Sequence, residues 1–123
     1  IEALSRGASM VTFIDGSSEH LKLAWSNICY LKEEEKSTLI RVKVENLPKA
    51  KDKFNLVFID PPYFKKLADK ALLSLVNRDW LEKGAIVIVE QARIEELSFS
   101  SECYREIDTR VYGNSRFTIL ESL

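Results

Sequence analysis

The fold of this chain is decided by the stretch Phe54-Asn55-Leu56-Val57-Phe58-Ile59-Asp60-Pro61-Pro62-Tyr63. Its first part, residues 54–59, is almost entirely apolar, as expected for a parallel β-strand that is buried on both faces. The strand must end at Asp60, because the two prolines that follow can continue neither a strand nor a helix. The sequence therefore predicts a buried strand whose carboxyl end carries a rigid polar turn.

Before this stretch the sequence predicts two strands and a helix. Residues 11–15 are β-prone and stop at the turn signal Asp15-Gly16. Ser17-Ser18-Glu19 then opens a helix, with a serine in the N-cap position and apolar residues at helical spacing as far as Leu31. Residues 39–44 alternate between apolar and polar side chains, which predicts a strand with one solvated face.

After this stretch the sequence predicts a further helix and strand, and then a β-hairpin. Residues 65–76 predict an amphipathic helix, residues 80–84 a turn, and residues 85–90 a second strand buried on both faces. The runs 104–112 and 116–120, joined by Gly113-Asn114-Ser115, predict a β-hairpin. The whole order predicts an α/β fold, a doubly wound and mostly parallel sheet with a C-terminal antiparallel hairpin, in a single domain over residues 1–123.

Composition narrows the class of protein. The chain has 46% hydrophobic residues, a net charge of -1 and no apolar run of the roughly 20 residues that cross a membrane. Cys29 and Cys103 lie far apart without metal-ligand spacing, so we expect reduced thiols, no metal site and a cytoplasmic location. The net charge alone gives no support for a nucleic-acid partner, which would have to bind to a local basic face.

Polar residues follow each predicted parallel strand at its carboxyl end, which is where ligands bind in open parallel sheets. These residues are Asp15-Gly16, Glu45-Asn46, Asp60-Pro61-Pro62-Tyr63 and Glu90-Gln91, with Arg93 close behind. Because the strands are parallel, we expect one shared site at this edge of the sheet. Asp15 suits a ribose-diol acceptor, although Asp-Gly is also an ordinary turn.

Asp60-Pro61-Pro62-Tyr63 resembles the [Asn/Asp]-Pro-Pro-[Tyr/Phe] motif of amino-methyltransferases. The lone pair of a base's exocyclic amino group is delocalised into the ring, so the group is a poor nucleophile. A carboxylate and a backbone carbonyl that accept its two N–H groups would localise the lone pair and direct it at a sulfonium methyl group. The prolines would fix the carbonyl, and Tyr63 would stack on the extruded base. The alternative is a rigid turn in which Asp60 caps the next helix.

Read together, several stretches are similar to the RsmD family, bacterial enzymes that methylate guanine N2 in 16S ribosomal RNA. These stretches are residues 1–8 (IEALSRGA), residues 11–15, residues 55–63 and Tyr112-Gly113. The resemblance implies a Rossmann-like class I methyltransferase fold, S-adenosylmethionine as methyl donor and residues 60–63 as the catalytic motif. It also places Asp15 and Gly16 at the cofactor ribose, and Glu45-Asn46, where the family usually has Asp-Ala, at the adenine.

The front of the chain departs from the family. The family's first strand and its Gly-rich cofactor loop would precede Ile1, and the four glycines of this chain leave no place for such a loop elsewhere. Residues 1–7 also have the pattern of a helix end, with Gly7 as its cap. We therefore expect an incomplete methyltransferase domain whose missing first strand lies between the strands at residues 11–15 and 55–60.

For the substrate, Lys65, Lys66, Arg93 and Arg116 are candidates to contact RNA phosphates. The expected partner is ribosomal RNA or a small-subunit particle, and the expected oligomeric state is a monomer. Three alternatives stay open: methylation of adenine N6, methylation of a protein amide, and a truncated non-catalytic remnant or interaction module.

Overall fold

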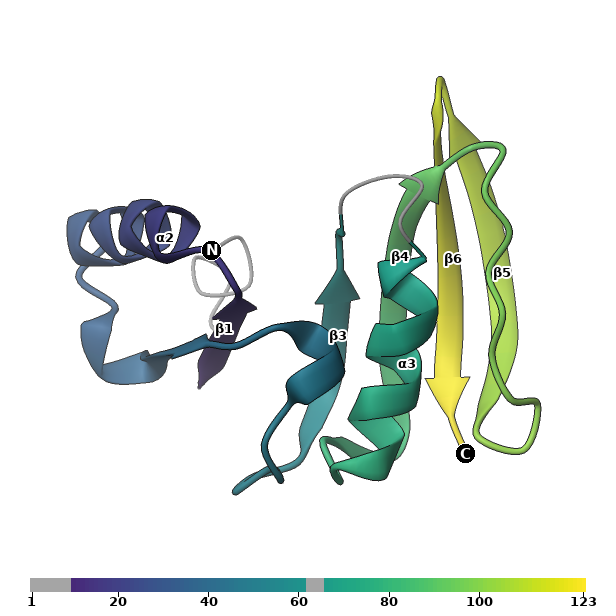
Figure 1. Ribbon diagram of the computed structural model, residues 1–123, viewed down its shortest axis with the longest axis horizontal. Coiled ribbons are helices and arrows are strands. Elements are labelled where there is room, and N and C mark those ends of the chain that lie inside the picture. The colour runs from purple at the N-terminus through teal and green to yellow at the C-terminus, as the bar shows by residue number, and fades with distance from the viewer. Residues whose placement is uncertain (1–9, 62–65) are drawn as a thin grey trace. The chain divides into compact units, whose positions relative to one another are not determined.

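The computed structural model describes residues 10–61 and 66–123, with every side chain in these ranges except that of Glu45. The chain divides into two compact units, residues 1–46 and residues 47–123. Each unit has its own sheet, and we describe each by itself (Figure 1).

The first unit is a parallel β–α–β arrangement. Its elements are β1 (Val11–Asp15), α2 (Ser18–Tyr30), the 3-10 turn η1 (Glu34–Lys36), β2 (Ser37–Arg41) and the 3-10 turn η2 (Val44–Asn46). The predicted helix start is confirmed, because the Ser17 hydroxyl accepts the His20 N–H at 3.3 Å. Ile28 of α2 is fully buried.

The predicted strand at residues 39–44 is wrong at both ends, because β2 covers Ser37–Arg41. The Val42 N–H donates to the Asp15 carbonyl at 3.1 Å as the last bond to β1, and the Asn46 N–H then donates to the Lys43 carbonyl at 2.8 Å. The second bond closes a turn. Glu45 and Asn46 therefore lie on η2, beyond the carboxyl end of β2.

The second unit is a mixed four-stranded sheet in the order β3-β4-β6-β5. Its elements are β3 (Phe54–Ile59), α3 (Leu67–Asn77), β4 (Leu81–Ala92), β5 (Tyr104–Tyr112) and β6 (Ser115–Ser122). β3 and β4 are parallel, whereas β6 is antiparallel to both of its neighbours, which confirms the predicted hairpin. α3 lies over one face of this sheet (Figure 1).

The core of the second unit lies between α3 and the sheet. Ala71, Leu72 and Leu75 of α3 face Val87 and Val89 of β4, and all five are buried. At the far end of the sheet the Trp80 ring stacks on Phe54 with centroids 5.7 Å apart, and its indole N–H donates to the Pro48 carbonyl at 2.9 Å. These contacts hold β3 and β4 in register beneath the helix.

The predicted turn at residues 80–84 is wrong, because β4 already begins at Leu81. The pairing moves from Phe54↔Leu81 to Leu56↔Ile86, so β4 uses five residues where β3 uses two. Gly84 lies in this irregular stretch with φ +81, a left-handed conformation that glycine adopts without steric cost. The glycine therefore marks a bulge inside a strand and not the end of one.

The prediction that β3 is buried on both faces also differs from the structure. Ile59 is buried, whereas Leu56 and Phe58 are 54% and 57% exposed. Successive side chains of a strand point to opposite faces, so Leu56 and Phe58 lie on one face and Ile59 lies on the other. α3 covers only the face that bears Ile59. In the described part of the chain β3 pairs with β4 alone and β1 with β2 alone, so no ladder joins β1 to β3.

Within the described residues, no helix is long and apolar enough to span a bilayer.

Candidate functional site

In the second unit the predicted motif lies at the carboxyl end of β3. The last rung of the β3–β4 ladder pairs Ile59 with Val89, and Asp60 and Pro61 follow directly. Asp60 is exposed and Pro61 is half-buried. The remaining predicted residues of this segment, Pro62, Tyr63 and Lys65, lie outside the described residues. The described part of the motif is thus at the predicted sheet edge, with an accessible carboxylate.

Lys66 immediately precedes α3 and occupies the N-cap position of that helix. This excludes the alternative in which Asp60 caps the helix. Lys66 is exposed and has φ 53, a left-handed conformation that costs a non-glycine residue roughly 1–2 kcal/mol. Such backbone outliers gather at functional loops, and this one directly follows the segment that carries the motif.

Arg93 and Arg116 reach the same edge from β4 and β6. Arg93 is exposed, and its N–H donates to the Asn114 carbonyl in the hairpin turn at 2.7 Å. Arg116 pairs with Gln91 across the β4–β6 ladder. Gln91 is 3% exposed, and its Oε1 atom and the Nε of Arg116 are buried without a hydrogen-bond partner. A buried donor and a buried acceptor left unpaired are costly, so these two atoms call for a further partner, such as a bound water.

The loop after β4 is fastened to this edge by two carboxylates. The Glu95 side chain accepts the Ala92 N–H at 3.2 Å, and the Asp69 side chain on α3 accepts the Ser98 N–H at 2.9 Å. These bonds link the carboxyl end of β4 to the first turn of α3. Asp60, Lys66, Arg93 and Arg116 therefore border one edge of the second unit.

In the first unit Asp15 lies at the carboxyl end of β1, half-buried, with 39% of its side chain exposed. Its Oδ1 accepts the Ser17 N–H at 2.8 Å, and its Oδ2 lies 3.1 Å from Nδ1 of His20. The carboxylate is thus held by the first turn of α2. His20 was not among the predicted site residues, and the only sequence signal for it is its place one turn after the N-cap Ser17.

Gly16 and Asn46 are the other described cofactor candidates, and both are exposed. A Cβ added at Gly16 would lie 3.6 Å from Cγ of Lys43, which is ordinary van der Waals contact. The backbone of Glu45 and Asn46 follows β2 on η2, in the same unit as Asp15. The candidates thus fall into one group in each unit, Asp15 with Gly16, Glu45 and Asn46, and Asp60 with the basic residues.

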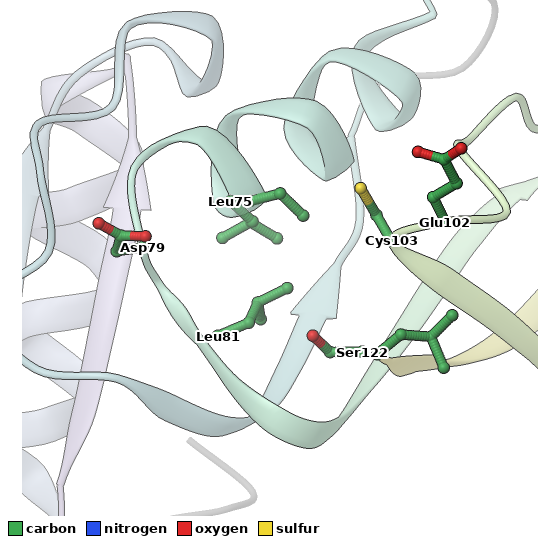
Figure 2. Close-up of a pocket in the computed structure, with 8 residues that line it drawn as sticks. Leu75, Asp79, Leu81, Glu102, Cys103 and Ser122 are labelled. Atoms are coloured by element: carbon green, nitrogen blue, oxygen red, sulfur yellow. The ribbon is translucent and has the colours of Figure 1, made fainter.

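The second unit has a pocket of about 220 Å³ at the end of the sheet where β4 begins and β6 ends, and Figure 2 shows the residues that line it. It is lined by Leu75, Val76, Asp79, Leu81, Glu102, Cys103, Ser122 and Leu123. Leu81 begins β4 and Ser122 ends the antiparallel β6, so this pocket faces the amino ends of the parallel strands. It does not contain any predicted site residue.

Among residues 10–61 and 66–123, no group of three or more His, Cys, Asp and Glu side chains is placed to hold a metal ion. Cys29 and Cys103 are both free thiols.

Comparison with known proteins relates the whole chain to methyltransferases. The family model described as Conserved hypothetical protein 95 matches residues 1–121. Ribosomal RNA small subunit methyltransferase D of Haemophilus influenzae is 31% identical over 100 residues, which cover 78% of this chain and 52% of that protein. The chain therefore spans about half the length of this relative.

Solved structures give the same answer for the fold. The crystal structure of a candidate methylase from Haemophilus influenzae has a TM-score of 0.86 and 26% identity, over 99% of this chain and 78% of that one. The N-methyltransferase NodS from Bradyrhizobium japonicum, solved with S-adenosyl-l-homocysteine, has a TM-score of 0.69 and 12% identity, over 98% and 70% of the two chains. The fold is therefore the Rossmann-like fold of class I methyltransferases, as the sequence predicts, and the chain belongs to the Conserved hypothetical protein 95 family, which is the RsmD family.

Proposed function

We propose that this protein transfers a methyl group from S-adenosylmethionine to the exocyclic N2 amine of a guanine in 16S ribosomal RNA. The observation that carries the proposal is the accessible Asp60 carboxylate, directly after β3, at the ligand-binding edge of a class I methyltransferase sheet. The relative named Ribosomal RNA small subunit methyltransferase D supports RNA as the substrate class.

The proposed chemistry relies on positioning and electrostatics. Asp60 and the backbone carbonyl of Pro61 accept the two N–H groups of the guanine amine, which localises the nitrogen lone pair. Pro61 and Pro62 fix the backbone that presents these acceptors. Tyr63 stacks on the guanine once the base has left its own stack. S-adenosylmethionine supplies an electrophilic methyl group on a positively charged sulfur, so no covalent enzyme intermediate is needed.

The described residues of the first unit have the right chemistry for the donor. A carboxylate such as Asp15 is a suitable acceptor for a ribose diol, and contacts from Ser17 and His20 already hold it at the end of β1. Gly16 leaves the approach open, while Glu45 and Asn46 are proposed to contact the adenine. NodS, which has the same fold, was solved with S-adenosyl-l-homocysteine, the demethylated form of this donor.

The basic residues around Asp60 are proposed to bind the RNA backbone. Lys66 and Arg93 are exposed at the sheet edge, and Arg116 is half-buried there. Together with Lys65 they would contact phosphates and set the position of the acceptor nucleotide. We further propose that the two units form one methyltransferase domain, active as a monomer on ribosomal RNA or on a small-subunit particle. The two free thiols support a cytoplasmic location.

Substitution of Asp60 tests the catalytic assignment. Asp60→Ala should lower the rate of tritiated methyl transfer to a 16S RNA transcript by about 10²–10³, because one preorganised polar group is lost. Affinity for S-adenosylmethionine should change less than a few-fold. Asp52→Ala is a matched control, since Asp52 is an exposed aspartate before the other end of β3. An Asp60→Ala protein with more than half of the wild-type rate would refute the assignment.

Calorimetric titration with S-adenosylmethionine separates the enzyme from a non-catalytic remnant. Binding in the micromolar range supports the enzyme, and the absence of heat supports the remnant. Analysis of the methylated nucleoside then decides between guanine N2 and adenine N6, and label found in protein would indicate an amide substrate.

A further inference from the structure

The β5–β6 hairpin carries a bulge that determines which side chains share a face. The register runs from Glu106↔Leu120 to Asp108↔Ile119, so Ile107 is an extra residue in β5. Beyond the bulge Asp108, Arg110 and Tyr112 lie on the same face as the odd-numbered residues of β6, which include Phe117. This is the face that α3 leaves uncovered, because the even-numbered Leu120 and Thr118 are buried with Val87 and Val89.

On this face Tyr112 is held in place but remains open to solvent. Its ring makes an edge contact with Phe117, with centroids 5.9 Å apart and planes at 71°. Arg110 lies beside it and donates from Nε to Oδ2 of Asp108 at 3.0 Å. That bond raises the pKa of the Arg110 guanidinium above its ordinary value. Tyr112 is nevertheless 61% exposed. A fixed and exposed aromatic ring is a preorganised surface for stacking.

This ring is at the same edge of the sheet as Asp60. Tyr112 ends β5 at the hairpin turn, and Figure 1 shows this turn at the end of the sheet to which the arrowheads of β3 and β4 point. Asp60 directly follows the last β3–β4 pair, Ile59↔Val89, and therefore lies beside Glu90 of β4. Across the next two ladders, Glu90 pairs with Phe117 of β6, and Phe117 pairs with Arg110 of β5. Three inter-strand spacings therefore separate Asp60, at the end of β3, from Arg110 on β5, which is a distance of about 14 Å across the sheet.

The surroundings of Tyr112 suit a nucleic acid. Arg93 is fastened to the hairpin turn through its N–H bond to the Asn114 carbonyl, and it is exposed. Arg93 is thus anchored at the hairpin turn, and Arg110, whose guanidinium is paired with Asp108, lies beside the Tyr112 ring on the same face of β5. Bases stack on such rings while cations contact the adjoining phosphates.

We propose that Tyr112, supported by Phe117 and Arg110, is a stacking platform for an unpaired base of the RNA near the acceptor guanine. This inference rests on the proposed function and adds a second contact point, which fixes the RNA strand across the sheet edge from Asp60 toward the hairpin. The platform would act on RNA affinity and positioning, while Asp60 acts on the amine.

The test measures binding of a fluorescein-labelled 16S RNA fragment by the full-length protein, together with methyl transfer to it. Tyr112→Ala should weaken the RNA affinity by about 5- to 150-fold, and Tyr112→Phe should stay within about threefold of wild type. Arg110→Ala should weaken binding and reduce the salt dependence by about one phosphate contact. Affinity for S-adenosylmethionine should not change in any of these variants.

Two matched controls separate the platform from a general surface effect. Tyr30 is 87% exposed on α2 in the other unit, and Tyr30→Ala should leave RNA affinity unchanged. Arg105 is paired with Glu121 at 2.9 Å, as Arg110 is with Asp108, but it lies at the other end of β5, so Arg105→Ala should bind RNA normally. Tyr112→Leu keeps apolar contact with Phe117 but has no ring, and it should lose affinity without a large change in thermal unfolding.

The outcomes are distinguishable. Wild-type affinity in Tyr112→Leu or Tyr112→Ala, in a wild-type protein that methylates RNA, would overturn the platform and leave the proposed function intact. If the variants bind less RNA only in proportion to the fraction of protein that is unfolded, the Tyr112–Phe117 contact is structural, and this result also overturns the platform. A wild-type protein that neither binds nor methylates RNA would overturn the proposed function itself.

Discussion

The Nδ1 atom of His20 lies 3.1 Å from Oδ2 of Asp15, and Oδ1 of the same carboxylate accepts the Ser17 N–H at 2.8 Å. The carboxylate at the end of β1 is therefore oriented by the first turn of the following helix. It keeps 39% of its side chain exposed, so it remains available to a ligand.

Asp15→Ala should weaken S-adenosylmethionine binding by about 10- to 150-fold, since hydrogen bonds to a charged group contribute roughly 1.5–3 kcal/mol. Calorimetric titration measures the effect, and RNA affinity should not change. His20→Ala removes one orienting contact and should have a smaller effect. If Asp15 only forms the turn, Asp15→Ala will lower the unfolding temperature and leave the cofactor affinity unchanged.

Tyr63→Phe should be mild and Tyr63→Ala severe, because we propose that the ring stacks on the acceptor base. Stacking contributes roughly 1–3 kcal/mol per base, so the loss in Tyr63→Ala should reach about 5- to 150-fold in kcat/KM. Steady-state methyl transfer measures both variants. Equal losses in the two variants would show that the hydroxyl, and not the ring, is the important group.

Tyr104→Phe should destabilise the second unit by about 1 kcal/mol. The Tyr104 hydroxyl donates to the Leu72 carbonyl at 2.5 Å, and Tyr104 is 2% exposed. The Leu72 carbonyl lies inside α3, where the helix supplies a second donor, so no buried acceptor is left unpaired. Urea denaturation measures the change, and Tyr30→Phe, on an exposed ring, is the control.

The same tyrosine should make stability depend on alkaline pH. Burial raises the pKa of Tyr104 above its ordinary value of 10.0, so the folded state holds the phenol proton more tightly than the unfolded state does. The stability that this provides is complete below pH 10 and decreases as the pH rises above it. Wild type should therefore lose stability above about pH 10 more steeply than Tyr104→Phe. Parallel curves for the two proteins would contradict this prediction.

The sequence predicts an element well where local and global signals agree. Ser17 marks a helix start by its side-chain bond, and the run before Asp60 ends where proline forbids continuation. Around Gly84 the sequence predicts a turn where the structure has a bulge, because glycine is typical of both and the sequence alone does not separate them. The apolar composition of residues 54–59 predicts burial on both faces of β3, but composition shows only what a strand can bury and not which elements cover it.

For the candidate site, the sequence predicts Asp15 and Asp60 because each follows the carboxyl end of a predicted parallel strand. The structure places each of them directly after its strand, in two separate sheets, and their roles remain predictions. Tyr112 was noted only as part of the family resemblance. The face of the sheet on which Tyr112 lies depends on the bulge at Ile107, because the extra residue changes which side chains of β5 point to each face. The local sequence does not predict that bulge. The unpaired Gln91 amide oxygen depends on contacts between distant strands, which a local pattern does not record.

The one-sided pairing of β3 has a consequence for the behaviour of the polypeptide in solution. Among the described strands, only β4 pairs with β3, so the backbone N–H and C=O groups along the other edge of β3 are open to a strand from another molecule. Residues 54–59 contain neither a charge nor a proline that would discourage such pairing. The protein should therefore self-associate as its concentration rises, with β3 as the template. A lysine in place of Asn55, which is exposed on this strand, should suppress that aggregation.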